Sequence, residues 1–292
     1  MPAIFGRWIA FVICLVAIPG LFASDIWTGE YSFNETYVGN ATVSHGQKRV
    51  VDFDESDTEI RFVLTPRIPL GVLRLGVEYE QFSFGFEGSA LLPNTLQSVA
   101  AVIGLDTQIK NSILLRVEAM PGVYSEAFRT GSNDFNMPFV IGGTYIVNPD
   151  LQIAIGIGVD IDRKYPVLPG GGIRWKFQPH WVLNAILPQP RLEYEVSKTV
   201  TLYVGANLKE TNFRVSDTFG TDHGKPQLNH AVLTYSEVRT GTGLDWKINN
   251  WLSVNAEAGY QPYRTFDFYR ANFEFDQDSS APYGMISFHG VF

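Results

Sequence analysis

The chain has 292 residues, a formal net charge of −8, a mean hydropathy of +0.00 and a single cysteine, Cys14. An acidic chain is not expected to bind nucleic acid, because phosphates attract basic surfaces. One cysteine can form neither an intramolecular disulfide nor a thiolate metal cluster. The composition therefore excludes a disulfide scaffold, and no motif in the sequence calls for a metal or another cofactor.

The amino terminus has the pattern of a secretory signal. Arg7 supplies a positive charge, the run from Trp8 to Phe22 is apolar, and the small residue Ala23 follows it. A Pro-Gly pair interrupts this run, which falls short of the roughly 20 apolar residues of a membrane-spanning helix. We predict that residues 1–23 form a signal peptide and that the exported chain, having lost Arg7, has a net charge of −9 and no cysteine.

Two segments lack a clear strand pattern. Residues 24–57 are polar and spotted with aromatic residues but have no clean period, which predicts an N-terminal periplasmic extension. In residues 93–105, Leu96, Val99 and Ile103 recur at three- and four-residue spacing, which predicts one short periplasmic helix.

From about residue 58 onward, apolar and polar residues alternate with a period of two. Residues 151–162 place Leu, Ile and Val on one face and Gln, Ala, Gly and Asp on the other, and residues 200–208 and 252–268 repeat this pattern. Such alternation is typical of strands with one apolar and one polar face. Strands are expected near residues 58–66, 72–86, 111–122, 136–147, 151–162, 168–177, 181–187, 190–196, 200–215, 231–248, 251–269 and 281–292.

The connections alternate between short turns and longer loops. Short turns are expected at residues 147–151, 177–181, 196–200 and 248–251, and a long loop at 216–229. Short turns on one side and long loops on the other are typical of outer-membrane barrels. We therefore predict an all-β fold, a transmembrane antiparallel up-and-down β-barrel over residues 58–292, with about twelve strands (range roughly 10–14) and short periplasmic turns.

Charged residues of both signs lie on the polar faces of these strands. Charged side chains that face lipid would destabilise the barrel. Their position on the polar face of each strand therefore predicts that they line the barrel lumen. One interpretation is a solute path, and the other is an interior filled by mutually neutralising ion pairs. The predicted lumen-lining residues are Arg61, Arg74, Glu78, Arg116, Glu118, Arg174, Lys176, Arg191, Glu193, Glu237, Arg239, Asp245, Lys247 and Glu257.

Aromatic residues gather near the predicted strand ends. Trp175, Trp181, Trp246 and Trp251 flank the short turns, which favours a membrane girdle. The alternative is the aromatic core of a soluble β-sandwich.

The last strand carries an apolar row to the final residue of the chain. Phe288 and Phe292 belong to this row and resemble the signal that the barrel-assembly machinery reads, although Gly290 stands where a larger residue is usual.

Enzyme signals are weak, and we predict that the protein is not an enzyme. His223 and His230 share a loop with acidic residues, but a solvated loop explains them better than a metal site does. Ser287 and His289 are two residues apart, and a lipid hydrolase of the outer membrane would need such a pair on the outer wall of the barrel.

Several segments together resemble a family of outer-membrane β-barrel proteins classed as a domain of unknown function. The resemblance covers roughly residues 58–292 and implies a barrel in the outer membrane of a Gram-negative bacterium, but it brings no activity or catalytic residue. It rests on Pro169–Trp175 (PGGGIRW), Ile186–Tyr194 (ILPQPRLEY), Leu202–Ala206 (LYVGA), Asn212–Val215 (NFRV) and Gly259–Asp267 (GYQPYRTFD).

These patterns lead to one functional hypothesis and two alternatives. The first is a narrow outer-membrane channel for small solutes. The others are a non-conducting structural or ligand-binding barrel and, less favoured, an outer-membrane lipid hydrolase. The expected partners are outer-membrane lipids, the barrel-assembly machinery and small solutes, and no nucleic acid.

Overall fold

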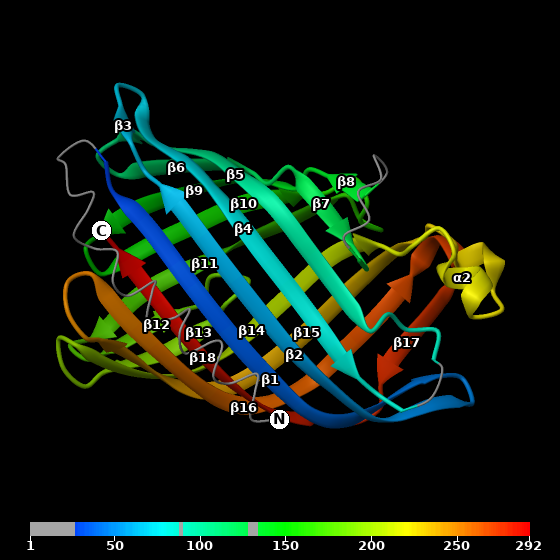
Figure 1. Ribbon diagram of the computed structural model, residues 1–292. Helices are drawn as coiled ribbons and strands as arrows, with labels where there is room; N and C mark the ends of the chain where they lie inside the picture. Colours follow the sequence, from blue (N-terminus) through cyan, green and yellow to red (C-terminus); the bar gives the residue numbers. More distant parts are fainter. Residues whose placement is uncertain (1–26, 88–89, 128–133) are drawn as a thin grey trace.

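The computed structural model describes residues 27–87, 90–127 and 134–292, and this part of the chain forms one closed antiparallel barrel of 14 strands (Figure 1). The barrel closes where the first strand pairs with the second on one edge and with the last on the other, so Phe33 lies opposite both Ile60 and Phe288. The predicted signal peptide lies outside the described residues.

Some of the barrel strands are interrupted, so the segments are numbered β1 to β18. Short breaks separate β2 from β3, β6 from β7, β8 from β9 and β17 from β18. The strands are β1 (Gly29–His45), β2 (Lys48–Leu64), β3 (Arg67–Ile68), β4 (Gly71–Gly85), β5 (Thr95–Lys110), β6 (Ile113–Ala119), β7 (Gly122–Ser125), β8 (Phe135–Asn136), β9 (Phe139–Asn148), β10 (Leu151–Val159), β11 (Val167–Gln178), β12 (Trp181–Asn184), β13 (Arg191–Glu195), β14 (Val200–Arg214), β15 (Val232–Lys247), β16 (Leu252–Phe268), β17 (Phe273–Gln277) and β18 (Ala281–Val291).

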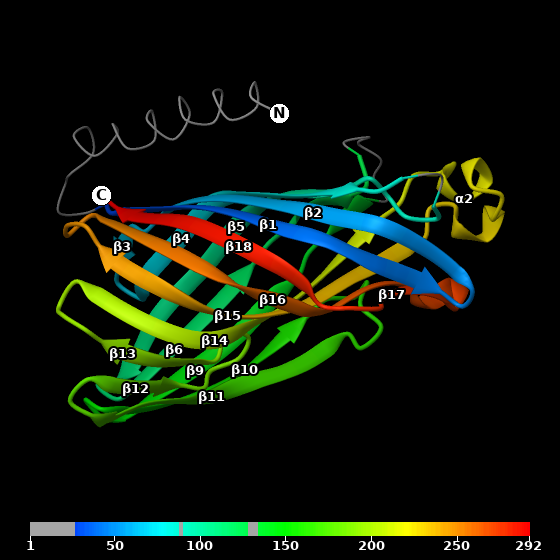
Figure 2. The same ribbon diagram turned by 90° about the horizontal axis from the view of Figure 1, so that it is seen from below.

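Both ends of the described barrel lie at one rim, which we call the terminal end. The backbone N–H of Gly29 donates to the carbonyl of Phe292 at 2.8 Å, and the N–H of Phe292 donates back at 2.9 Å. The four predicted short turns also lie at this rim, and the connections at the opposite rim, the loop end, are longer except for the tight turn between β1 and β2 (Figure 2). The loop end carries the short helices α2 (Phe219–Asp222), η2 (Pro226–Leu228) and η3 (Tyr269–Ala271). No helix in the described residues is long and apolar enough to cross a membrane.

The prediction of a separate extension over residues 24–57 is wrong for the residues that the structure describes. Residues 29–57 form β1 and most of β2, which pair with each other along their length. The strand period was hidden because polar residues such as Glu35 and Thr58 point outward while Asp57 points inward, and register shifts follow Val38. In β1, the aromatic residues Tyr31, Phe33 and Tyr37 do alternate with polar residues, and only Glu35 and the shifts after Val38 interrupt this period.

The predicted helix at 93–105 is also wrong, because this segment belongs to β5. It pairs with β4 on one side and with β6 and β7 on the other. Leu96 and Val102 are buried inside the barrel, whereas Val99 and Ile103 are exposed on the outside. Apolar residues on both faces imitated a helical spacing. Strands β1 and β5 account for the difference between the expected twelve strands and the observed 14.

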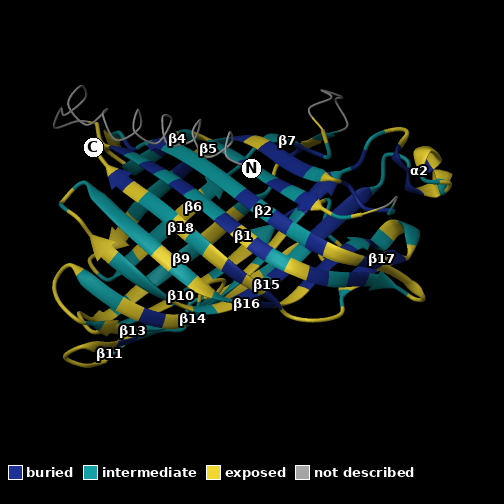
Figure 3. Cartoon of the chain, turned by 60° about the horizontal axis from the view of Figure 1, so that its bottom comes forward, coloured by how far each residue is buried: buried dark blue, intermediate teal, exposed yellow. Residues whose placement is uncertain are grey.

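The outer wall is apolar toward the terminal end and polar toward the loop end. On the β2–β5 side, Val77 and Ile103 are exposed apolar residues of the terminal half. Further toward the loop end, the outward residues Glu35, Thr58 and Gln81 lie side by side at one level. Figure 3 shows exposed and buried positions alternating along these strands.

The interior of the loop half is filled by a cluster of apolar and aromatic side chains. Phe53, Phe82, Tyr235 and Phe266 are fully buried there, and the rings of Phe82 and Tyr235 are 4.8 Å apart. The loop half thus resembles a soluble protein, with an apolar interior and a polar exterior, while the terminal half has the opposite arrangement.

Candidate functional site

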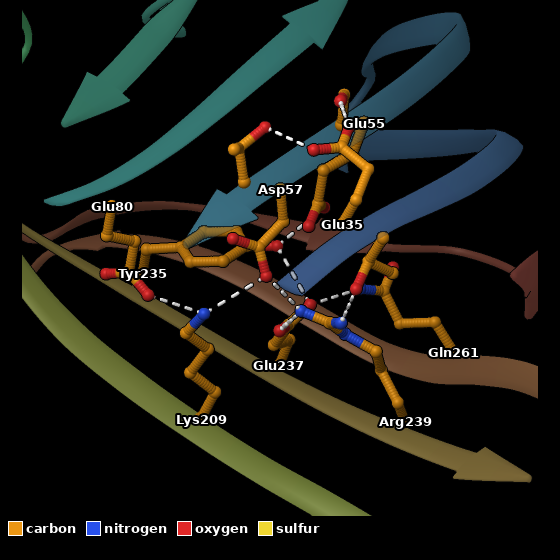
Figure 4. A network of polar contacts seen from close by, with 12 residues as sticks. Glu35, Glu55, Asp57, Glu80, Lys209, Tyr235, Glu237, Arg239 and Gln261 are labelled. Atoms are coloured by element: carbon orange, nitrogen blue, oxygen red, sulfur yellow. Dashed lines mark hydrogen bonds and ion pairs between the residues drawn. The ribbon is translucent and has the colours of Figure 1, made fainter. Parts of the chain in front are cut away.

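A buried network of charged residues, drawn in Figure 4, adjoins the aromatic cluster through Tyr235. Arg239 donates to Asp57 at 2.6 Å and to the hydroxyl of Thr36 at 2.7 Å, and it also contacts Glu237. Lys209 lies 3.0 Å from Asp57 and 2.5 Å from Glu80. Because burying a lone charge is costly, these groups persist inside the barrel only by neutralising one another.

The network continues across the barrel to β16. Arg264 lies 3.2 Å from Glu55, and both side chains are fully buried. The hydroxyl of Tyr235 donates to Glu55 at 2.6 Å, and the Gln261 amide donates to Glu237 at 2.5 Å. The residues of the network come from β2, β4, β14, β15 and β16. The network therefore spans the lumen as a polar layer next to the aromatic cluster.

Two further polar clusters lie nearer the terminal end. In the first, Glu118 accepts from Arg61 at 2.5 Å and from Arg74 at 3.0 Å, and Arg61 also donates to Glu78 at 2.8 Å.

In the second cluster, Glu257 accepts from the hydroxyls of Tyr203 and Tyr283. Arg191 lies over the Tyr203 ring at 4.1 Å and 3.7 Å from Asp245.

The register places every predicted lumen-lining residue on the inner face of the barrel. Arg116 pairs with Asp106 at 2.6 Å, and Lys176 pairs with Glu195 at 2.5 Å. Glu193 lies opposite Tyr203, and Arg174 and Lys247 share the inner face by register. The extensive ion pairing favours the interpretation of a neutralised interior at mid-height, and the solute path stays a prediction.

Several members of the buried network were not among the predicted lumen-lining residues. Glu55 and Asp57 were assigned to the extension, so their parity was not read. Arg264 and Gln261 were missed because a register shift between Val238 and Thr240 breaks the simple alternation where β15 pairs with β16. A search for charged residues at every second position of residues 48–64 would have found Glu55 and Asp57.

A cavity of about 870 Å³ lies in the terminal half of the lumen, along β5, β6, β9, β10 and β11. Its wall is built from small inner-face residues. Added Cβ atoms at Gly158 and Gly170 would meet no atom within 4 Å, so both positions face open space. Arg116 and the exposed apolar side chains of Leu114 and Val140 also line it. The cavity reaches Gly71 and Gln108 beside the turns of the terminal end.

The predicted girdle residues lie near the terminal end. Trp175, Trp181 and Trp246 are partly exposed on the outward face, and Trp251 lies in the turn before β16. Their role as a membrane girdle stays a prediction.

The apolar row of the last strand also faces outward. Phe288 packs beside Phe33, and Phe292 packs against Tyr31 and Phe62, with ring centroids 6.3, 6.4 and 5.8 Å apart. A Cβ at Gly290 would lie 2.2 Å from the Tyr31 ring, which explains the small residue in this row. The assembly role of Phe288 and Phe292 stays a prediction.

The histidines considered as candidate catalytic or metal-binding residues lie on the inner face of the last strand and in the loop between β14 and β15. Ser287 and His289 share the inner-face parity of Tyr283, so they do not lie on the outer wall as a lipid hydrolase would require. His230 lies 2.7 Å from Asp217, and His223 bonds the Phe219 carbonyl. No group of three or more potential metal ligands occurs in the described part of the chain.

A solved structure with a similar fold is an outer-membrane channel. An outer membrane channel from Pseudomonas putida F1 superimposes with a TM-score of 0.52 and 8% identity, over 94% of this chain and 99% of that chain. The P. putida toluene transporter TodX gives a TM-score of 0.42 and 10% identity, over 93% and 91%. A Pseudomonas aeruginosa FadL homologue gives 0.37 and 9%, over 92% and 90%.

The search of curated proteins gave no match. The family model described as Domain of unknown function (DUF6268) matches residues 65–284. Because this match spans most of the barrel, the chain belongs to that family.

Proposed function

We propose that the barrel spans the outer membrane of a Gram-negative bacterium, with its terminal end in the periplasm. The apolar outward wall of the terminal half supports this placement, since charged residues on a lipid-facing wall cost about 2–4 kcal/mol at the bilayer midplane. The polar outward level around Glu35 and Gln81 then marks the outer membrane surface. The loop half projects beyond it.

Within this placement, the protein is a narrow channel for small solutes. The observation that carries this proposal is the cavity of about 870 Å³ in the terminal half of the lumen. A cavity of this size accommodates a small organic molecule, because ligand sites commonly enclose about 300–1,000 Å³. Its glycine-rich wall keeps it open, since Gly158 and Gly170 leave space where side chains would otherwise project.

The alternative is a non-conducting structural or ligand-binding barrel. The aromatic cluster and the buried network together favour it, because they fill the lumen between the cavity and the loop end. Ions have no evident straight path through a layer in which Arg264 and Glu55 are fully buried.

The proposed partners follow from the outward wall and the chain end. Outer-membrane lipids contact the apolar band, and the barrel-assembly machinery recognises the last strand with Phe288 and Phe292. Deleting Phe292 is expected to lower the amount of membrane-inserted protein more than the stability of the assembled barrel, because its ring packs on the outside against Tyr31 and Phe62. Unchanged membrane levels would contradict an assembly signal.

The channel is tested by uptake into Gram-negative cells that produce the protein. The probes are a glucose-sized sugar and a hydrophobic naphthylamine dye that fluoresces in an apolar environment. We expect at least one probe to enter faster than in cells without the protein, and Gly170→Phe to abolish the gain by filling the cavity. Gly284→Phe is the matched control, because its Cβ also meets no atom within 4 Å but projects outward.

The outcomes separate the two functions. If no probe enters faster, or if Gly170→Phe transports like the unaltered protein at equal membrane level, the channel is wrong and the non-conducting barrel is favoured.

A further inference from the structure

The barrel wall is incompletely paired between β11 and β14. On one edge of β11, residues 167–170 pair with β10. On the other edge, β12 pairs only from Arg174 onward, and the last backbone bond toward the loop end joins Leu187 N–H to the Gly171 carbonyl. Within the described part of the chain, no strand pairs with residues 167–170 on this edge.

Strand β14 has the matching defect. Its N-terminal part pairs with β13, and the N–H of Leu208 donates to the Pro188 carbonyl at 3.0 Å. No further strand partner occurs on this edge, among the residues described, until Arg214 reaches Ser125 of β7. The β12–β13 hairpin is therefore too short to fill the wall, and a lateral gap is left between β11 and β14.

The gap has a defined border on each side. The hairpin tip, residues 185–190, bounds it toward the terminal end. Toward the loop end it is bounded by residues 160–166, the β10–β11 connection, which we call the clasp. The clasp lies across the outer face of β14, where Asp160 accepts from Asn212 at 2.7 Å and Arg163 lies 2.6 Å from Glu210. Asn212 has outward parity but is only 2% exposed, because the clasp covers it.

The lumenal cavity extends to three borders of this gap. Its lining includes Arg163 of the clasp, Leu168 of β11 and Leu187 of the hairpin tip. The rim on the outer side is apolar: Val167 and Leu208 have outward parity and are 53% and 40% exposed, and Leu187 at the hairpin tip is 48% exposed. The cavity therefore extends from the turns of the terminal end to the inner side of the gap, and Leu187 belongs both to its lining and to the border of the gap.

We propose that this lateral gap is the entrance of the channel and that its substrates are small apolar molecules dissolved in the lipid phase. This inference rests on the proposed function. Molecules of this class partition into the bilayer and reach the apolar rim without crossing the aromatic cluster and the buried network. The glycine wall of the cavity then leads them past Arg116 toward the periplasmic turns. Polar solutes have no such access, because the loop end is filled.

The rim is tested by a charge placed on it. Leu208→Lys puts an ammonium group at the border of the gap, whereas Leu202→Lys puts the same charge on the same strand and the same face, away from the gap. The two leucines both point outward and are similarly exposed, at 40% and 46%, and comparison at equal membrane level removes differences in insertion. We expect Leu208→Lys to lose most of the naphthylamine uptake and Leu202→Lys to keep it, measured at equal membrane levels.

The comparison with Gly170→Phe separates this inference from the proposed function. If Gly170→Phe blocks uptake but Leu208→Lys and Leu202→Lys transport alike, the channel stands and the lateral entrance is wrong. Faster uptake of the sugar than of the dye would also overturn the apolar substrate class. If Gly170→Phe has no effect, the channel itself fails.

Discussion

The two halves of this barrel place their polar and apolar residues in opposite ways, although the same strands build both. In β2, Phe53 near the loop end points into the apolar interior, while Arg61 near the terminal end points inward to an ion-pair cluster. On the outward side, polar Thr58 gives way to Phe62 toward the terminal end. Under the proposed membrane placement, a single strand serves both as part of a soluble cap and as part of a membrane-facing wall, because its two halves meet different solvents.

The largest expected effect comes from the layer that separates the halves. Arg239→Ala leaves the carboxylates of Asp57 and Glu237 buried without their guanidinium partner. Breaking a buried pair in this way costs about 3–5 kcal/mol of unfolding free energy. Urea unfolding in lipid vesicles, followed by heat-modifiable gel mobility, measures this loss.

The control for that prediction is Arg116→Ala, whose side chain is 53% exposed in the cavity beside Asp106. Exposed pairs contribute only about 0–1 kcal/mol. Equal losses of unfolding free energy in the two variants would mean that breaking the buried pairs costs no more than breaking the pair in the open lumen.

The second prediction locates the boundary between the halves on the outer wall. Val77 and Gln81 lie on the same outward face of β4, separated by one outward residue, Tyr79. Val77→Arg places a charge in the apolar band, with a cost of about 2–4 kcal/mol if that level lies near the bilayer midplane. Gln81→Arg should cost little, because that level is already polar. The same unfolding measurement in vesicles applies, and an equal cost at both positions would contradict the assigned membrane level.

The smallest expected effect on stability is at the clasp, where the two halves meet at the gap. Arg163→Ala removes the contact with Glu210, whose side chain is 35% exposed, and we expect a smaller loss of unfolding free energy than in Arg239→Ala. Dye uptake should nevertheless rise, since the side chain borders both the cavity and the gap.

Lys164→Ala is the matched control for the clasp. Lys164 belongs to the same segment but pairs with Asp267 at 3.4 Å, and this carboxylate raises the pKa of Lys164. Because Lys164 does not line the lumenal cavity, its removal should leave uptake unchanged. Faster uptake in both variants would indicate a general loosening of the clasp rather than an opening at Arg163.

Several features of the fold were predictable because they follow from local alternation. Residues 151–162 combine an apolar face with a face of Gln, Ala and Gly, and β10 forms there with Ile155 pointing outward and Gly156 inward. The short turns were predictable for the same reason, since turn residues punctuate the alternating runs. Strand β5 was harder to predict in this way, because apolar residues lie on both of its faces, and in β1 the alternation is interrupted at Glu35 and shifted after Val38.

The partners of the charged residues were beyond local patterns. Parity alone indicated that Arg239 points inward, but its partner Asp57 lies 182 residues away in the chain. Which residues meet across a lumen depends on the register and closure of the whole barrel, and each one-residue shift would change every pair.

By itself, the sequence determined that the chain forms alternating strands whose charged faces turn away from an apolar exterior. It also determined where most turns fall, since these properties depend on neighbours within a few positions. Only the tertiary structure decided that β1 and β5 belong to the wall, that aromatic residues fill the loop half, and that a gap remains between β11 and β14. Those features depend on pairing between strands far apart in the chain, and a short hairpin leaves two distant edges without a partner.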